Sequence, residues 1–327
     1  MKEKMKRLKN WLPKLFIVFL CICVVIGTIS FSLFKKDDKL KIIYIPKTKD
    51  ETFFWSEVVA GAESAAKEYQ VELEVLAPDE EKNIEQQKAY IKQAIKKEPD
   101  ALVVSPSLYT GMTEIIEEAT ELGIPLILVD SQLDKDIESS YIGTDNADAG
   151  VKMGEKVQEC IKEDTKIAVM SQAKETSTAI EREEGLRKGL GKEERRIEKV
   201  LYCESDRQIA CNLTKELLSE CSDIDCIVGL NLVAVTGVAQ AVEEMGLSEQ
   251  VHVIGMDSDD EGIAYMERGT IDALVVQKPF HMGYFGIKTA VEIAEKQKVE
   301  PIIYSETELI TIDNIYSPQN EKLLFTF

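Results

Sequence analysis

Polar side chains follow the ends of several buried, strand-like segments of this sequence, and an aromatic cluster stands in the loop after the first segment. The strand-end residues are Ser105, Asp130, Asn231, Asp257 and Gln277, and the loop contributes Glu51, Phe53, Phe54 and Trp55. Carboxylates and amides form hydrogen bonds with hydroxyl groups, while aromatic rings cover the apolar face of a sugar ring. The pattern therefore predicts a site that binds a polyol.

Each of these residues also has a purely structural explanation. Asp130, Asn231 and Asp257 stand where a strand gives way to a turn, and there Asp and Asn favour local hydrogen bonds to the backbone. Gln277 could cap its strand, and the two phenylalanines of the loop could form the apolar contact at a helix start. The recurrence of polar groups at one edge of successive strands favours the binding interpretation.

The sequence contains few residues that suit other chemistry. Its two histidines are His252, in an apolar strand-like run, and His281, near a helix start, and neither has the spacing of a metal ligand. The sequence has no G-x-S-x-G motif, no P-loop and no G-x-G-x-x-G after a strand. We therefore expect no catalytic residues, no metal and no cofactor, and a binding protein in place of an enzyme.

The elements that must position the polar residues are apolar runs of strand length alternating with amphipathic helical patterns. Runs such as Ala-Leu-Val-Val are typical of strands buried on both faces. The predicted strands are 41–46, 71–76, 101–105, 125–130, 141–144, 166–171, 198–203, 226–231, 251–257, 273–277 and 308–312. The predicted helices begin with 55–69 and continue with 84–97, 112–122, 147–161, 180–190, 209–218, 233–245 and 282–296.

This alternation predicts an α/β protein with parallel sheets. The strands exceed those of one ordinary open sheet, and an irregular passage at 143–146 separates two series, so we expect two doubly wound lobes. Ligands of such sheets bind beyond the carboxyl ends of the strands, where the polar residues stand.

The N-terminal segment differs from the rest of the chain. A basic head, 1–14, precedes an apolar run, 15–34, and a charged linker, 35–41. The run has the length of a membrane-spanning helix, and the basic flank predicts that the head is cytoplasmic. We expect a single-pass signal anchor with the binding domain on the extracytoplasmic side. Cleavage near Ser30 and lipidation of Cys21 or Cys23 stay open as alternatives.

The charge of the chain is uneven. The whole sequence carries a net charge of −20, and residues 1–41 hold ten Lys or Arg and three acids, so that subtracting their +7 leaves −27 on the rest. Such an acidic domain repels nucleic acid, and we expect no nucleic-acid partner.

Five cysteines follow the N-terminal segment: Cys160, Cys203, Cys211, Cys221 and Cys226. Their odd number and irregular spacing indicate neither a disulfide framework nor a zinc site. A single bridge from Cys221 to Cys226 and free buried thiols both stay open.

Seven segments, taken in order, resemble the type I periplasmic sugar-binding proteins, especially those similar to ribose-binding protein. Among them, 53–54 resembles the family's Asn-Pro-Phe-Phe loop, 127–132 its strand ending in Asp-Arg-Gln, and 253–257 its Val-Gly-Phe-Asp strand. The other segments are 143–146, 176–186, 229–231 and 276–279. The same lobes occur in lactose-repressor-like regulators. A regulator of that kind would need a helix-turn-helix and a basic footprint at its N-terminus, where this sequence has the apolar run 15–34 followed by an acidic domain.

The resemblance implies two lobes that close on a ligand about a three-strand hinge. It places crossings near Thr144, Lys278 and Leu309. The first lobe would then be 42–144 with 278–309, and the second 145–277 with 310–327.

The resemblance also implies which residues touch the ligand. The contacts carried over are Phe53, Phe54, Asp130, Arg182, Asn231, Asp257 and Gln277. Glu51, Trp55, Ser105, Ser131 and Ser205 are secondary candidates. Without the resemblance, Arg182 in its acid-rich helical stretch would be a solvated residue with local ion pairs.

Some positions depart from the family's pattern. Glu51 stands where the pattern has Asn, Ser131 where it has Arg, Ser205 where an aromatic is usual and Leu232 where it has Asp. Losing a cationic fork and gaining a carboxylate changes which hydroxyl pattern, or which charge, the pocket accepts.

The leading functional prediction is a solute-binding protein that captures a small polar ligand, most simply a monosaccharide, and delivers it to the permease subunits of an ABC importer. The alternative is a sensory receptor that uses the same closure to regulate a membrane histidine kinase.

Overall fold

The computed structural model describes residues 39–49 and 53–325. The predicted head (1–14), the anchor (15–34) and most of the linker (35–41) lie outside these residues, as does Glu51. Within the described part of the chain, no helix is both long and apolar enough to cross a membrane. The anchor therefore stays a prediction.

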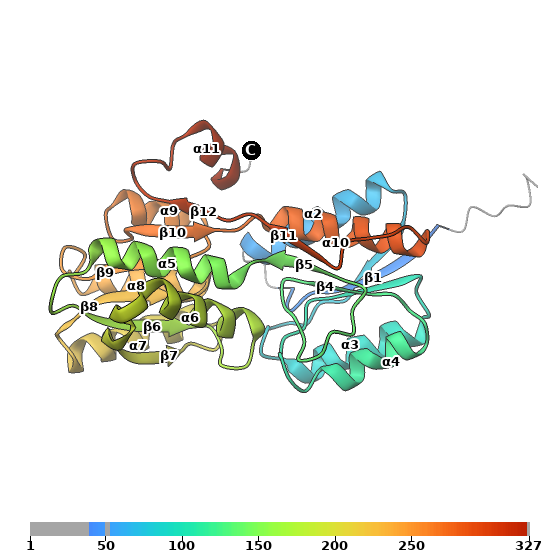
Figure 1. The fold of residues 1–327 in the computed structure, drawn as a ribbon, viewed down its shortest axis with the longest axis horizontal. Coiled ribbons are helices and arrows are strands. Elements are labelled where there is room, and N and C mark those ends of the chain that lie inside the picture. Colours follow the sequence, from blue (N-terminus) through green and yellow to red (C-terminus); the bar gives the residue numbers. More distant parts are fainter. Residues whose placement is uncertain (1–38, 50–52, 326–327) are drawn as a thin grey trace, which may run out of the picture. The chain divides into compact units, whose positions relative to one another are not determined.

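The first lobe is built on a six-stranded parallel sheet with the strand order β11-β5-β4-β3-β1-β2 (Figure 1). Its strands are β1 (Lys41–Ile45), β2 (Glu72–Val75), β3 (Ala101–Val104), β4 (Leu126–Val129), β5 (Ser140–Thr144) and β11 (Ile302–Ser305). Every residue of β3 and β4 is buried, because helices cover both faces of the sheet.

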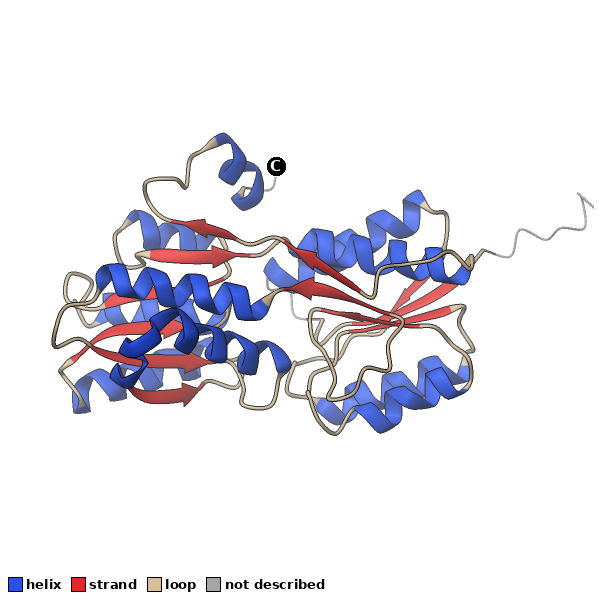
Figure 2. Ribbon diagram, in the orientation of Figure 1, coloured by secondary structure: helices blue, strands red, loops and turns tan. Residues whose placement is uncertain are grey.

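Two pairs of helices form the outer layers of the first lobe (Figure 2). Their bounds are α2 (Phe53–Glu68), α3 (Ile84–Lys96), α4 (Thr113–Glu121) and α10 (Pro279–Ala294). The helices α2 and α10 pack on one face of the sheet around Trp55, Val58 and Met282. The helices α3 and α4 pack on the other face around Ile91 and Ile116.

The second lobe repeats this plan with the strand order β12-β10-β9-β8-β6-β7. Its strands are β6 (Lys166–Ser171), β7 (Ile197–Tyr202), β8 (Ile224–Gly229), β9 (His252–Met256), β10 (Ala273–Val276) and β12 (Glu308–Ile310). All pairs are parallel except β10 with β12, which is antiparallel.

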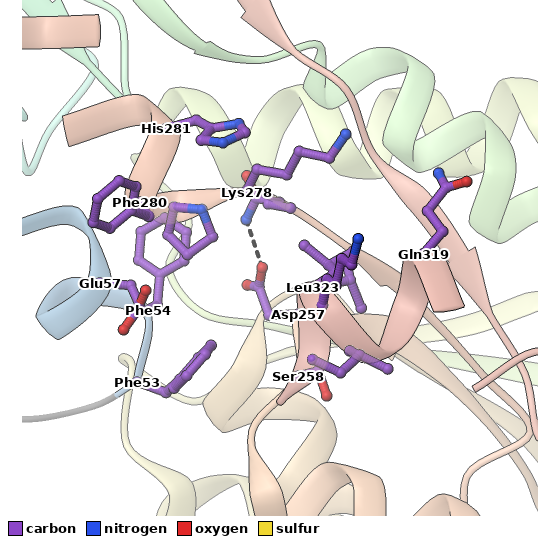
Figure 3. Close-up of a pocket in the computed structure, with 15 residues that line it drawn as sticks. Phe53, Phe54, Glu57, Asp257, Ser258, Lys278, Phe280, His281, Gln319 and Leu323 are labelled. Carbon is purple, nitrogen blue, oxygen red and sulfur yellow. Dashed lines mark hydrogen bonds between the residues drawn. The ribbon is translucent and has the colours of Figure 1, made fainter. Parts of the chain in front are cut away.

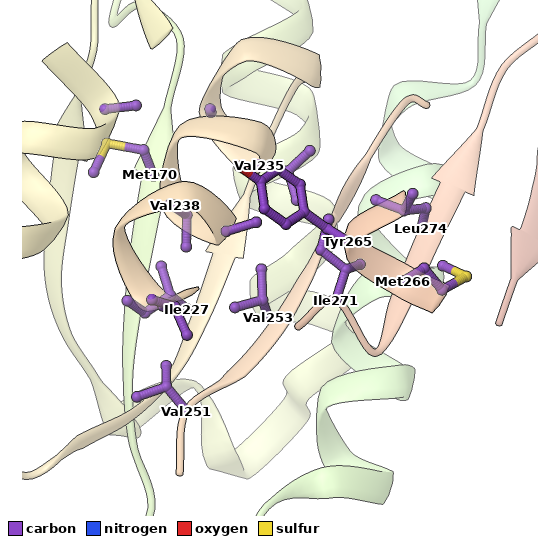
Figure 4. Packing of buried hydrophobic residues seen from close by; sticks show 14 of the residues in the cluster. Met170, Ile227, Val235, Val238, Val251, Val253, Tyr265, Met266, Ile271 and Leu274 are labelled. Carbon is purple, nitrogen blue, oxygen red and sulfur yellow. The ribbon is translucent and has the colours of Figure 1, made fainter. Parts of the chain in front are cut away.

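The helices of the second lobe again cover both faces. They are α5 (Asn146–Cys160), α6 (Ser177–Leu190), α7 (Arg207–Glu220), α8 (Leu232–Glu244), α9 (Asp260–Glu267) and α11 (Pro318–Leu324), with a 3-10 helix η1 at Gly191–Arg196. The core beneath α7, α8 and α9 is continuous, and Figure 4 shows Ile227, Val238 and Val253 within it. The prediction of two doubly wound α/β lobes is confirmed.

Glycines allow α5 and α6 to approach closely. A side chain on Gly150 would collide with the carbonyl oxygen of Arg182, and one on Gly185 would collide with the backbone of Ala147. Because the two helix backbones touch here, Arg182 of α6 lies beside Asn146 at the start of α5. Larger residues in place of the glycines would hold the two helices farther apart.

The chain passes between the sheets at three points, between β5 and α5, between β10 and α10, and between β11 and β12. The third crossing, between Ser305 and Glu308, lies before the predicted position near Leu309. Leu309 itself is inside β12 and pairs with Val275 of the second sheet, so it belongs to the second lobe. The strand β11 and the helices α9 and α11 were missing from the predicted elements. The strand lies at the edge of its sheet and exposes Ile302 and Tyr304, so it lacks the continuous apolar run of a central strand.

Candidate ligand-binding cleft

A polar cavity of about 300 Å³ lies between the carboxyl ends of the two sheets. The first lobe lines it with residues that follow β1, β2 and β4 and with the start of α2. The second lobe lines it with residues that follow β6, β7, β8, β9 and β10 and with residues of α6. This is the edge at which doubly wound sheets bind ligands. We call it the polar compartment.

Most of the candidate residues meet at this compartment. Those that line it are Phe54, Trp55, Asp130, Arg182, Ser205, Asn231, Asp257 and Gln277. Phe53 lies in the same helical turn as Phe54 and faces a neighbouring cavity. Ser105 is fully buried against the hydroxyl of Tyr44, and Ser131 donates to the carboxylate of Asp130, so both are packed behind the lining.

On the first-lobe side, Asp130 forms a buried ion pair with Lys47. The Lys47 ammonium lies 3.0 Å from Asp130 Oδ2, and both side chains are at most 5% exposed. The same ammonium lies 5.8 Å from the centre of the Trp55 ring and 3.6 Å from Glu81. Lys47 thus brings a positive charge to the Asp130 carboxylate, in a chain that has Ser131 where the family's pattern has an arginine.

Sequence reasoning missed Lys47, and it also missed Gln172. Each follows a predicted strand, 41–46 or 166–171, so the rule that pointed to Asp130 and Asp257 would have found both. The amide of Gln172 is 3% exposed and donates to Thr178, while its oxygen Oε1 is buried without a hydrogen-bond partner. A buried acceptor of this kind, in the lining of a cavity, suits a ligand that donates a hydroxyl proton.

On the second-lobe side, Arg182 is 3% exposed, so the alternative of a solvated helical residue is wrong. Its Nε donates to Asn146 Oδ1 at 2.8 Å, and its Nη1 donates to the carbonyl of Leu230 at 2.9 Å. Asn231 lines the cavity while its Oδ1 accepts from the backbone of Ala234 and caps α8. The structural and the binding interpretations of Asn231 are therefore compatible.

Asp257 and Gln277 form a hydrogen-bonded chain with Thr144. Gln277 Nε2 donates to Asp257 Oδ1, and Thr144 Oγ1 donates to Gln277 Oε1, both at 2.6 Å. Burial raises the pKa of the Asp257 carboxyl, while the Arg182 guanidinium partly opposes that rise. Because Thr144 and Gln277 precede two of the three crossings, the chain joins the cleft to the hinge.

A second cavity of about 480 Å³ adjoins the polar compartment (Figure 3). Phe54, Asp257 and Gln277 line both cavities. Figure 3 shows Phe53, Phe54 and Phe280 along one side, and Leu323 of α11 across from them. We call this cavity the aromatic compartment.

No group of three or more His, Cys, Asp or Glu side chains that could hold a metal ion occurs among the described residues. The five cysteines of the described part are free thiols, so the open alternative of a Cys221 to Cys226 bridge is not formed. His252 lies at the start of β9 beside Asp272, and His281 lies on the exposed side of α10 at the rim of the aromatic compartment.

Two lobes with polar residues facing one cleft define a solute-binding protein of the periplasmic type. Residues 42–298 match the family described as periplasmic binding protein domain, and the chain belongs to this family. More specifically, its relatives identify it as a type I periplasmic sugar-binding protein of the kind that serves ABC transporters.

Among curated proteins, the ribose import binding proteins of Haemophilus influenzae and Escherichia coli are each 25% identical to this chain. The matches cover 81% and 84% of this chain and 89% and 90% of those proteins. A solved sugar transporter from Clostridium phytofermentans is 37% identical with a TM-score of 0.79, over 84% of this chain and 99% of the other. A solute-binding protein from Agrobacterium radiobacter, solved in complex with D-arabinose, is 28% identical with a TM-score of 0.85, over 88% and 100%.

Proposed function

We propose that this protein captures a monosaccharide in the polar compartment and delivers it to the membrane subunits of an ABC importer. The observation that carries the proposal is a cavity lined from both lobes by buried polar groups, including the unpartnered acceptor Gln172 Oε1. Sugar hydroxyls both donate and accept hydrogen bonds, so they can satisfy this acceptor and the carboxylates of Asp130 and Asp257. The names of the relatives, which include ribose and D-arabinose binders, support the same class of ligand.

The aromatic part of the site supports a sugar in preference to a small ion. Phe54 and Trp55 meet edge to face, with ring centres 5.2 Å apart, in the first turn of α2. Phe54 lines the cavity beside the polar groups, and an aromatic ring can pack against the C–H face of a pyranose or furanose.

Contacts between the lobes support hinge closure as the mode of capture. The backbone N–H of Tyr109 donates to the carbonyl of Glu175 at 2.8 Å, and that of Gln132 donates to Ser177 Oγ at 2.9 Å. These bonds join residues after β3 and β4 to residues at the start of α6. A ligand that touches both lobes stabilises the arrangement in which these bonds are made, because it binds that arrangement more tightly.

The binding domain is extracytoplasmic in this family, and we propose that the segment 15–34 holds it at the membrane. Fractionation of cells that express the full chain, beside a variant without residues 1–41, tests this: the full chain is expected in the membrane fraction. Recovery of an intact, soluble full chain would contradict the anchor.

A thermal-shift screen tests the ligand class. We expect D-ribose, D-arabinose, D-fucose or D-galactose to raise the unfolding temperature, since a ligand that binds the folded state stabilises it. The matched variants are Asp257→Asn, expected to weaken binding, and Asp136→Asn on an exposed loop, expected to have no effect. A shift with amino acids and none with any sugar would overturn the proposal.

The importer role has its own test. Genes for a permease and an ATPase beside the gene of this protein would support delivery to an importer. A neighbouring histidine kinase and response regulator, without importer genes, would contradict it and support the sensory alternative.

A further inference from the structure

The aromatic compartment differs in character from the polar compartment beside it. Phe53 and Phe54 of α2 and Phe280 at the start of α10 form one side, and Leu323 of α11 lies opposite. The Phe280 side chain is 37% exposed, which leaves a large apolar surface in contact with water. The aromatic compartment, as the described residues define it, has a volume of about 480 Å³, which is within the range of small-molecule sites.

The two compartments are continuous in their lining. Phe54, Asp257 and Gln277 belong to both, so they form the boundary. Asp257 and Gln277 are polar, and they are among the groups that we propose hold the sugar. A substituent on a sugar carbon that faces these three residues would extend toward the aromatic compartment.

The charges around the aromatic compartment indicate the kind of substituent. The ionisable side chains of its lining are Glu57, Asp257, Lys278, His281 and Lys322, which combine two carboxylates, two ammonium groups and an imidazole. Groups of mixed sign do not select an anion or a cation, whereas the phenylalanines and Leu323 favour an uncharged apolar group. An aromatic ring suits this surface, because it can meet the phenylalanine rings edge to face.

We propose that the cleft takes glycosides that carry an aromatic or other apolar aglycone, with the sugar in the polar compartment and the aglycone between Phe280 and Leu323. This inference rests on the proposed function, since it needs a sugar in the polar compartment. It names a class of ligand that is larger than the monosaccharides of the leading proposal.

Isothermal titration of the full chain with matched ligand pairs tests the inference. The probes are the methyl and the phenyl glycosides of D-galactose, D-fucose, D-arabinose and D-ribose, each in both anomeric forms. For the sugar that binds, the phenyl glycoside is expected to bind about tenfold more tightly than the methyl glycoside, because most of its ring leaves water.

Two variants locate the gain. Phe280→Ala and Leu323→Ala are each expected to remove most of the phenyl advantage while methyl glycoside binding stays unchanged, because neither side chain lines the polar compartment. Leu122→Ala, at the exposed end of α4, is the matched control and is expected to change neither affinity.

The outcomes separate the two proposals. Equal or weaker binding of every phenyl glycoside, with a free sugar or methyl glycoside still bound, overturns this inference and leaves the proposed function intact. If the phenyl glycoside still binds more tightly than the methyl glycoside in both variants, the aromatic compartment does not hold the aglycone, and this inference is overturned. Failure of all sugars and glycosides to bind overturns both proposals.

Discussion

Asp130 in the first lobe and Asp257 in the second occupy equivalent places. Each follows the fourth strand of its lobe, β4 or β9, each has φ of 69°, and each donates its backbone N–H at 2.9 Å to the next strand, at Ile142 or Val275. Aspartate tolerates this left-handed conformation better than most residues, so the local backbone accounts for part of the preference.

The two carboxylates differ in how they are stabilised. Asp130 is paired with the buried ammonium of Lys47, 3.0 Å away. Asp257 accepts from the neutral amide of Gln277, and burial raises its pKa, with the charge of Asp130 adding to the rise. The first lobe therefore holds its charge by an internal ion pair. In the second lobe, burial makes the charged form of Asp257 unfavourable. Its carboxylate is hydrogen-bonded through Gln277 to Thr144 at the hinge, and it lines the cavity where a ligand can reach it.

The largest expected effect comes from breaking the ion pair. Lys47→Met leaves Asp130 buried and unpaired and is expected to lower the free energy of unfolding by about 3–5 kcal/mol, measured by urea denaturation. Adding Asp130→Asn to Lys47→Met is expected to restore most of the loss, because the neutral pair carries no uncompensated charge.

The matched control is Lys49→Met, which removes an exposed ion pair with Asp79 and is expected to change stability little. A loss in Lys47→Met that the second substitution does not restore would mean that the ion pair is not the cause.

A smaller effect is expected at the hinge. Gln277→Leu leaves Asp257 and Thr144 without their amide partner and is expected to cost about 2 kcal/mol in the same measurement, because one of the lost bonds is to a buried carboxylate. The same substitution at exposed Gln208 of α7 serves as control. Equal effects at Gln277 and Gln208 would show that the chain through Thr144 does not support the fold.

The smallest expected effect on stability is an increase, in contrast to the two losses above. Asp257→Asn keeps the shape and the left-handed backbone while removing the buried charge, so at pH 7 the ligand-free variant is expected to unfold at a slightly higher temperature than the wild type. It is also expected to bind sugar about ten- to a hundredfold more weakly, since hydrogen bonds to a charged group are lost.

The pH dependence follows from the raised pKa of Asp257. Between the ordinary pKa of an aspartate and its raised folded value, the folded protein binds more protons than the unfolded chain, so this group's contribution to stability falls as pH rises. The difference in unfolding temperature between Asp257→Asn and the wild type is therefore expected to be full above the raised pKa and to vanish below about pH 4. A difference that is independent of pH would contradict a carboxylate origin.

Sequence reasoning gave the central strands and the long helices, because continuous apolar runs and repeated 3.6-residue periods are local signals. It missed the edge strand β11, which exposes Ile302 and Tyr304 and so lacks a continuous apolar run, and the short helices α9 and α11, where the helical period spans few residues. At the site it reached Asp130 and Asp257 through their position after strands, but it applied the same rule neither to Lys47 nor to Gln172. It could assign Arg182 only by resemblance, since an arginine among glutamates is usually solvated.

The order of strands and helices, the polar strand ends and the acidic charge outside the first 41 residues are properties of the sequence by itself, because they depend on residue type and spacing. The tertiary structure decided which partners these residues have. Lys47 meets Asp130 because β1 and β4 end at the same edge of one sheet, with β3 between them. Arg182 is buried because glycines let α5 and α6 touch, and the aromatic compartment exists because α11 lies opposite α2 and α10. These contacts join residues far apart in the chain, and only the packing of complete lobes brings them together.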